Sequence, residues 1–172
     1  MTEHRLERDE FIAAASRFCE LYENAELLGR DNFLLGLDRV LPRLQASAVE
    51  LPYPDDADQI PDDDLDVLLT DEEGKAYLWA VSRLLQQIDW SGVQERLSEH
   101  AAGYTSPATE FLSDDLDGIY GDLQEGFRLI KAGRPEAEAI FYWRLGFWSH
   151  WGYHNAEALR VVHFHVALYL EG

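Results

Sequence analysis

The chain has 172 residues, of which 47% are hydrophobic and 12% are aromatic, a composition typical of a folded domain. Its 33 acidic and 14 basic residues give a formal net charge of -19 at pH 7. Such a surface repels the phosphates of nucleic acids and of anionic lipids. The composition therefore argues against nucleic acid and membranes as partners, and among proteins it favours a basic partner.

The cysteine content and the first residues predict where the protein resides. Cys19 is the only cysteine, and its place beside a helical apolar face predicts a buried side chain rather than a reactive thiol. Four of the first ten residues are acidic, where a signal peptide would have basic residues followed by an apolar run. No apolar run approaches the roughly 20 residues that cross a bilayer. We therefore expect a cytoplasmic protein.

Apolar residues recur at intervals of three and four through the first fifty positions and predict two amphipathic helices. The first is expected over residues 7–28, with Gly29 as its stop signal. Asp31 is placed to cap the second, which should run to about Leu51. Proline lacks an amide hydrogen and clashes with the preceding turn, so Pro42 should kink this helix or restart it.

An acidic stretch follows, with ten acidic and no basic residues between positions 55 and 73. It predicts a solvated loop over about residues 52–70. Asp62, Asp64 and Asp66 have the spacing of a calcium loop, but Val67 stands where that loop needs glycine. We prefer to interpret Thr70 as the N-cap of a capping box that begins the next helix.

The rest of the chain also has helical periods. They predict a helix to about residue 88, one or two turns over residues 93–99, a loop over residues 100–109, a long helix from Ser113 to Gly133, and a helix opened by Pro135. Gly152 is expected to separate that last helix from a final one over residues 154–169. No alternating strand pattern competes. The sequence therefore predicts an all-α fold, with residues 1–172 forming a single domain, a bundle of about six or seven helices, and residues 90–110 as a variable connector.

Residues 143–165, WRLGFWSHWGYHNAEALRVVHFH, include three of the five tryptophans and four of the six histidines. His150 and His154 are one helical turn apart, so both imidazoles can reach one metal ion. Asp115 and Asp122 of the preceding long helix, and Glu157 one turn on, can add carboxylates. The candidate site therefore comprises Asp115, Tyr120, Asp122, Trp143, His150, Trp151, His154 and Glu157.

Two well-known metal motifs do not match this segment. A zinc protease helix needs glutamate directly after its first histidine, and this chain has Trp151 there. A di-iron bundle needs Glu-x-x-His units, and the chain has none. A metal site would thus be a looser arrangement of the histidine pair and nearby acids.

Structural explanations compete with chemistry at these positions. Buried histidines are often hydrogen-bonded core residues. Asp115 follows Ser113, a helix cap, and could simply oppose the positive end of the helix dipole. Asp122 could pair with Arg144 or Arg160.

Four segments carry a family resemblance: FCELYEN, DRVLPRLQASAVELP, SDDLDGIYGDLQEG and FYWRLGFWSHWGYHNAEALRVVH. Together they resemble the small bacterial proteins grouped as domain of unknown function 5063. The resemblance implies an all-helical domain and no particular activity. The segments that carry it include Asp114, Asp115, Tyr120, Asp122, Trp143, Ser149, His150, Trp151 and His154.

Three functions remain open. The first is a non-catalytic binding or protein-interaction module without a cofactor. The second is a metal-binding protein or metal-dependent enzyme, in which His150, His154 and nearby carboxylates hold a divalent transition metal. The third is a small-molecule pocket lined by Trp143, Phe147 and Tyr120.

Overall fold

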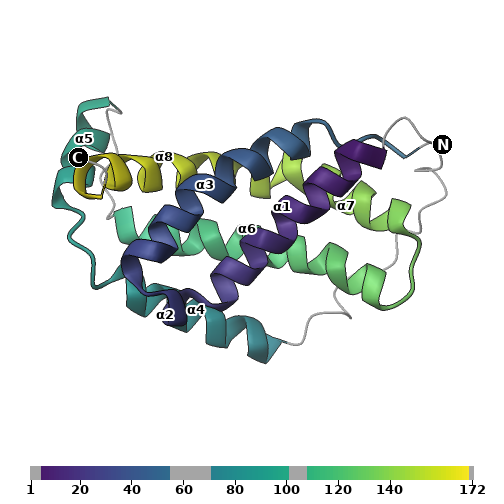
Figure 1. Cartoon of the computed structure of the whole chain (residues 1–172), viewed down its shortest axis with the longest axis horizontal. Coiled ribbons are helices and arrows are strands. Elements are labelled where there is room, and N and C mark those ends of the chain that lie inside the picture. Colours follow the sequence, from purple (N-terminus) through teal and green to yellow (C-terminus); the bar gives the residue numbers. More distant parts are fainter. Residues whose placement is uncertain (1–4, 55–70, 101–107, 171–172) are drawn as a thin grey trace.

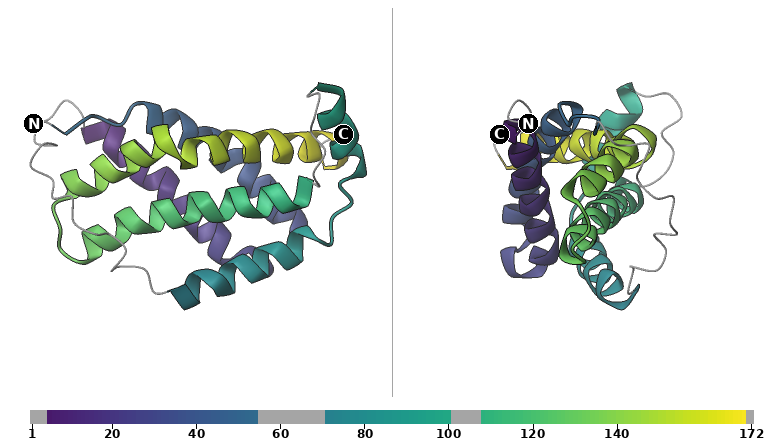
Figure 2. Two further views of the ribbon diagram at one scale, coloured as in Figure 1. Left: turned by 180° about the vertical axis from the view of Figure 1, so that it is seen from behind. Right: turned by 90° about the vertical axis from the view of Figure 1, so that its right-hand side faces the viewer.

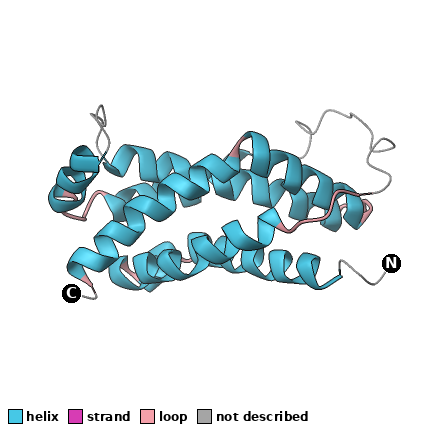
Figure 3. Cartoon of the chain, turned by 90° about the horizontal axis from the view of Figure 1, so that it is seen from above, coloured by secondary structure: helices cyan, strands magenta, loops and turns pink. Residues whose placement is uncertain are grey.

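The computed structural model describes residues 5–54, 71–100 and 108–170, and within these ranges the chain forms eight helices and no strand (Figures 1 and 3). The prediction of an all-α fold is confirmed, whereas the expected six or seven helices were too few. The helices are α1 Arg5–Glu23, α2 Ala25–Leu28, α3 Arg30–Val49, α4 Asp71–Leu85, α5 Ser91–His100, α6 Ala108–Lys131, α7 Glu136–Ser149 and α8 Trp151–Tyr169.

The long helices pack in two layers around one apolar core (Figure 2). Helices α1 and α3 pack against each other on one side, and α4, α6 and α7 lie on the other. Helix α8 contacts α3, α6 and α7, and so joins the layers. The largest fully buried side chains come from both layers and include Phe11, Phe18, Leu41, Trp143 and Trp151.

Helix α1 shows how the pattern of apolar residues becomes packing. Phe11, Phe18 and Tyr22 recur at helical spacing and are fully buried, so one face of the helix covers the core. Cys19 lies beside them and is also buried, which confirms the prediction made for its side chain.

Helix α3 runs through Pro42 as one helix, so of the two expected effects of this residue, a kink or a restart, the restart is wrong. Pro42 is exposed, while Leu41 and Leu44 beside it are fully buried. Burial of the apolar face stabilises the helix on both sides of the proline and outweighs the one amide donor that proline lacks.

Helix α6 begins at Ala108, five residues before the expected start at Ser113. Ser113 does not cap this helix. Its hydroxyl lies 2.6 Å from the hydroxyl of Ser82 and joins α6 to α4. Asp115 is consequently about two turns inside α6, where the helix dipole no longer explains a carboxylate.

Gly152 does not separate the last two helices, contrary to the prediction. It is a buried residue inside α8, and the break falls at His150, whose φ and ψ angles are -147° and -84°. A Cβ atom at position 152 would overlap the backbone oxygen of Phe147. The glycine is therefore needed because α7 and α8 approach closely at their junction, and not because the chain turns there.

Some predictions concern residues outside the described ranges. These include the calcium-like spacing, Thr70 of the expected capping box, and residues 101–107 of the expected loop. Within the described residues, no helix is both long and apolar enough to span a membrane.

Candidate functional site

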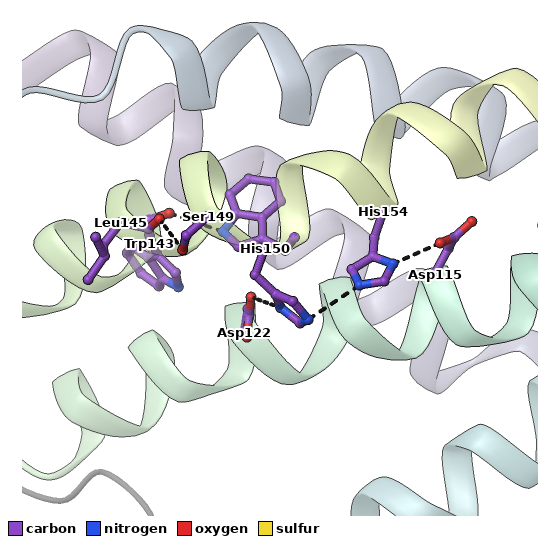
Figure 4. Close-up of polar contacts among 8 residues, drawn as sticks. Asp115, Asp122, Trp143, Leu145, Ser149, His150 and His154 are labelled. Atoms are coloured by element: carbon purple, nitrogen blue, oxygen red, sulfur yellow. Dashed lines mark hydrogen bonds and ion pairs between the residues drawn. The ribbon is translucent and has the colours of Figure 1, made fainter.

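Four side chains form a hydrogen-bonded row between α6 and α8 (Figure 4). Oδ2 of Asp122 lies 2.8 Å from Nδ1 of His150, and Oδ1 of Asp115 lies 2.7 Å from Nδ1 of His154. The two Nε2 atoms face each other at 3.3 Å. The histidine rings meet edge to face, with an interplanar angle of 79°. The structure thus brings together four of the eight residues proposed from the sequence.

The helices place these groups by simple spacing. Asp115 and Asp122 are seven residues apart, two turns of α6, so they lie on the same face. His150 forms the joint between α7 and α8, and His154 follows one turn into α8. Each histidine therefore lies opposite one aspartate.

Gly118 also shapes the site, and sequence reasoning did not single it out. It lies between the two aspartates on α6, and a Cβ atom there would come within 3.0 Å of Cδ2 of His154. The missing side chain lets the imidazole lie against the helix. A glycine inside a strongly amphipathic helix was the available signal, because glycine weakens a helix unless close packing requires it.

The row runs from solvent into the protein. The side chain of His150 is 55% exposed, those of Asp122 and His154 are 26% and 24% exposed, and that of Asp115 is 10% exposed. Burial raises the pKa of Asp115 to about 6, while its hydrogen bond with His154 acts in the opposite direction. The second oxygen of Asp115, Oδ2, is buried and has no hydrogen-bond partner in the described part of the chain.

The hydrogen bonds of the two imidazole rings restrict what can lie between their Nε2 atoms. An ionised aspartate can only accept hydrogen bonds, so an Nδ1 beside a carboxylate donates its hydrogen to the neighbouring oxygen. Each Nε2 of a neutral ring would then present a lone pair to the other. A hydrogen between the two nitrogens, or a cation that binds both, would make their 3.3 Å contact favourable.

Two candidate residues on the row's flanks have other contacts. Glu157 is exposed and pairs with Arg160, although its charge contributes to the raised pKa of Asp115. The hydroxyl of Tyr120 donates to Glu23 at 2.9 Å, and its ring stacks on that of Tyr22 with centroids 4.5 Å apart. Tyr120 therefore connects α6 to α1 and does not contact the histidines.

The two candidate tryptophans support the site from the core. The indole nitrogen of Trp143 donates to the backbone oxygen of Leu123, and that of Trp151 donates to the backbone oxygen of Trp143, both at 3.0 Å. The ring of Trp143 packs against Phe11 and Phe127, with centroids 5.1 Å from each. These contacts hold α7 and the first turn of α8 in place.

The ion pairs proposed as alternatives for Asp122 are not formed. Arg144 donates to the backbone oxygen of Leu51, and Arg160 pairs with Glu157. The site also differs from a closed core, because His150 is largely exposed. In the described ranges, no group of three or more histidine, cysteine or acidic side chains is arranged to hold a metal ion, so the row offers two nitrogen ligands.

The fold and the row together describe an all-helical bundle with a histidine–aspartate row between two of its helices. The family model for a domain of unknown function, DUF5063, matches residues 3–168. The chain belongs to this family, as the quoted segments indicated. No curated protein matches the chain.

The crystal structure of a Bacteroides fragilis protein is similar to the whole chain. Its TM-score is 0.71 at 21% sequence identity, and the match covers 99% of this chain and 97% of that protein. At this identity the similarity concerns the arrangement of the helices.

Proposed function

We propose that the protein is a metal-binding protein that holds one divalent transition metal ion, with zinc the best fit, on Nε2 of His150 and Nε2 of His154. The observation that carries the proposal is the 3.3 Å separation of these two nitrogens. Two imidazole nitrogens about 2.0–2.1 Å from one tetrahedral zinc ion lie roughly 3.3 Å apart. The pair is therefore spaced as two ligands of one such ion would be.

The carboxylates support the same assignment. Histidines that bind metals usually donate their other ring hydrogen to a carboxylate or a backbone oxygen, which fixes the tautomer and the ring orientation. Here a carboxylate oxygen of Asp122 lies beside Nδ1 of His150, and one of Asp115 lies beside Nδ1 of His154. They hold both rings with Nε2 free for a metal, and their negative charges favour a cation beside the rings.

The number of ligands favours binding over catalysis. Catalytic zinc sites usually have three protein ligands, and structural sites have four, whereas the described part of this chain supplies two. Water or groups from a partner would complete the coordination shell, and the exposed edge of His150 leaves room for them. We infer reversible binding of moderate affinity.

The shared proton and the metal would compete for the same space. Metal binding requires both Nε2 atoms to be unprotonated, so zinc affinity should increase as pH rises. Without metal, the proton between the rings keeps the row intact, and the apo protein would fold with the same geometry.

Titration of tag-free, chelator-treated protein with Zn²⁺ and with Co²⁺ tests the proposal. We expect one ion per chain, and an intense visible absorption from tetrahedral cobalt. His150→Ala and His154→Ala should each abolish the binding. His163→Ala is the matched control, because His163 also pairs with an aspartate, Asp38 at 3.0 Å, and is exposed. Absence of binding, or stoichiometric binding that survives both site variants, would contradict the proposal.

A further inference from the structure

A groove lies between α1 and α3, the two helices nearest the viewer in Figure 1, and its lining includes three arginines. It is an open cavity of about 840 Å³. On α1 its lining extends from Glu10 to Leu21, a distance of about 16 Å at 1.5 Å per residue. The groove is therefore about three helical turns long.

Three arginines line this groove: Arg17 from α1, and Arg39 and Arg43 from α3. Arg39 and Arg43 are one turn apart, so they lie on the same face of α3, and both are exposed. In the described part of the chain neither forms an ion pair or a hydrogen bond. Arg17 has a single exposed contact, 3.3 Å from Glu20. Two neighbouring guanidinium groups thus have no carboxylate partner among the described residues, although the sequence has 33 acidic residues.

Small residues form the floor between the arginines. Ala13 and Ala14 on α1 face Ala46 and Ser47 on α3, and these short side chains leave the hollow between the two helices. A ridge of larger side chains from another helix can enter such a groove, as ridges enter grooves wherever helices pack. The lining thus combines an apolar floor with three arginines, while Glu10 and Glu50 lie at the outer ends of the lined segments.

We propose that this groove binds an amphipathic helix of a partner protein, with leucine-like side chains on the floor and glutamates or aspartates against Arg17, Arg39 and Arg43. Arginine suits this role because its planar fork pairs with carboxylates. Recognition of a helix by a groove needs an apolar stripe for affinity, and charges beside the stripe set orientation and partner choice.

A second copy of this chain fits the groove poorly. Each copy has a net charge of -19, so electrostatic repulsion opposes a contact between two copies. The inferred partner differs from the basic partner that the net charge favours. Charges are screened beyond roughly 8 Å at physiological ionic strength, so the local arginines decide the contact within the groove.

The test uses a synthetic 18-residue helical peptide with a leucine stripe flanked by glutamates, and a second peptide in which lysines replace the glutamates. Binding to the full chain is measured by fluorescence anisotropy. We expect the glutamate peptide to bind and the lysine peptide to bind at least tenfold more weakly. The double variant Arg39→Glu, Arg43→Glu should weaken binding of the glutamate peptide at least tenfold.

Arg5→Glu is the matched control, because Arg5 lies on α1 outside the groove lining and its side chain is 76% exposed. This variant should bind the glutamate peptide as the parent chain does, and circular dichroism confirms that each variant is folded. Failure of the glutamate peptide to bind, equal or tighter binding of the lysine peptide, or an unchanged affinity in the double variant would overturn the proposal. A chain dimer that dissociates in the double variant would overturn it too, since a second copy would then be the occupant.

Discussion

Nε2 of His150 lies 3.3 Å from Nε2 of His154, with His150 at the junction of α7 and α8 and His154 at the end of the first turn of α8. The spacing depends on α6, because an aspartate of that helix fixes Nδ1 of each ring. One face of α6 therefore determines how the imidazole rings of His150 and His154 are oriented.

This dependence predicts the effect of Asp122→Asn on zinc binding. The amide keeps the size of the side chain but removes the negative charge and can present its NH₂ group to Nδ1 of His150. Substitution of such supporting carboxylates typically lowers metal affinity by about 10–100-fold. We expect a decrease in this range in a zinc titration followed by calorimetry.

Asp38→Asn provides the control, because Asp38 supports His163 in the same manner and away from the proposed site. This variant should bind zinc as the parent chain does. Equal losses in both variants would show that the effect is one of overall charge, and the role given to Asp122 would then be wrong.

His165 leads to a prediction about pH. Its side chain is buried between the rings of Trp90 and Tyr169, and this burial lowers its pKa. The unfolded chain therefore binds a proton to His165 at a higher pH than the folded chain does. As pH falls from about 6.5 toward the lowered folded value, the free energy of unfolding must decrease, by at most about 1.4 kcal/mol per pH unit from this group.

His165→Phe keeps an aromatic ring against Trp90 and cannot take up a proton. From pH 7 to pH 5 the parent chain should lose more stability than the variant. The unfolding free energy of the variant minus that of the parent chain should therefore increase as pH falls. Urea unfolding at several pH values measures this difference. A difference that is constant with pH would contradict the assignment.

The sequence predicted the members of the histidine–aspartate row better than their surroundings. The helical period of residues 143–169 and the seven-residue interval between Asp115 and Asp122 are local features, and they correctly place two imidazoles and two carboxylates on facing helices. Glu157 and Tyr120 also satisfied the local pattern. Their contacts with Arg160 and Glu23 depend on the direction of each side chain, which spacing alone does not determine.

The errors in the helix boundaries have the same origin. Ser113 and Gly152 carry strong local signals for a helix start and a helix break. The structure places both inside helices, since Ser113 contacts Ser82 of α4 and Gly152 lies against Phe147 of α7. At each position a contact with another helix outweighed the local preference for a helix end. For Ser113 that helix is distant in the sequence, and for Gly152 it is the preceding one.

Net charge was also an incomplete guide. A value of -19 averages over the whole surface, and it does not show that Arg17, Arg39 and Arg43 line one groove. The positions 39 and 43 are one turn apart in sequence, which was a readable signal. The contribution of Arg17 depends on how α1 packs against α3.

Cys19 should be protected from thiol reagents in the folded protein. Burial raises the pKa of its thiol well above the usual range, and the nearby carboxylate of Glu23 acts in the same direction. Because the thiolate is the reactive form, labelling should require the chain to open. We expect reaction with a disulfide reagent to be slow in buffer and fast in denaturant.

The labelling rate can be compared with the stability of variants. If opening is needed, a variant that destabilises the fold without touching Cys19 should be labelled faster, by about tenfold for each 1.4 kcal/mol of lost stability. Fast labelling of the parent chain in buffer would show that α1 frays or that the thiol is accessible.

Two glycines of α6 provide a matched test of how this helix packs. Gly126 lies against the indole ring of Trp143, and a Cβ atom there would overlap Nε1 and Cε2 of that ring. Trp143 is buried and its Nε1 donates to Leu123, so the ring cannot move aside without losing that hydrogen bond and its core contacts. Gly126→Ala should therefore destabilise the protein by about 1–3 kcal/mol, the usual range for overpacking.

Gly121→Ala should have the opposite effect. Gly121 lies in the same helix, and nothing would lie within 4 Å of an added Cβ atom except the helix backbone and chain neighbours. Alanine is favoured over glycine in a helix by about 1 kcal/mol, so this variant should be more stable by up to that amount. Urea unfolding of both variants measures the contrast. Because helix propensity favours alanine equally at both positions, a destabilisation confined to Gly126→Ala would come from the contact with Trp143, whereas equal stabilisation of both variants would mean that the indole ring can move away from α6.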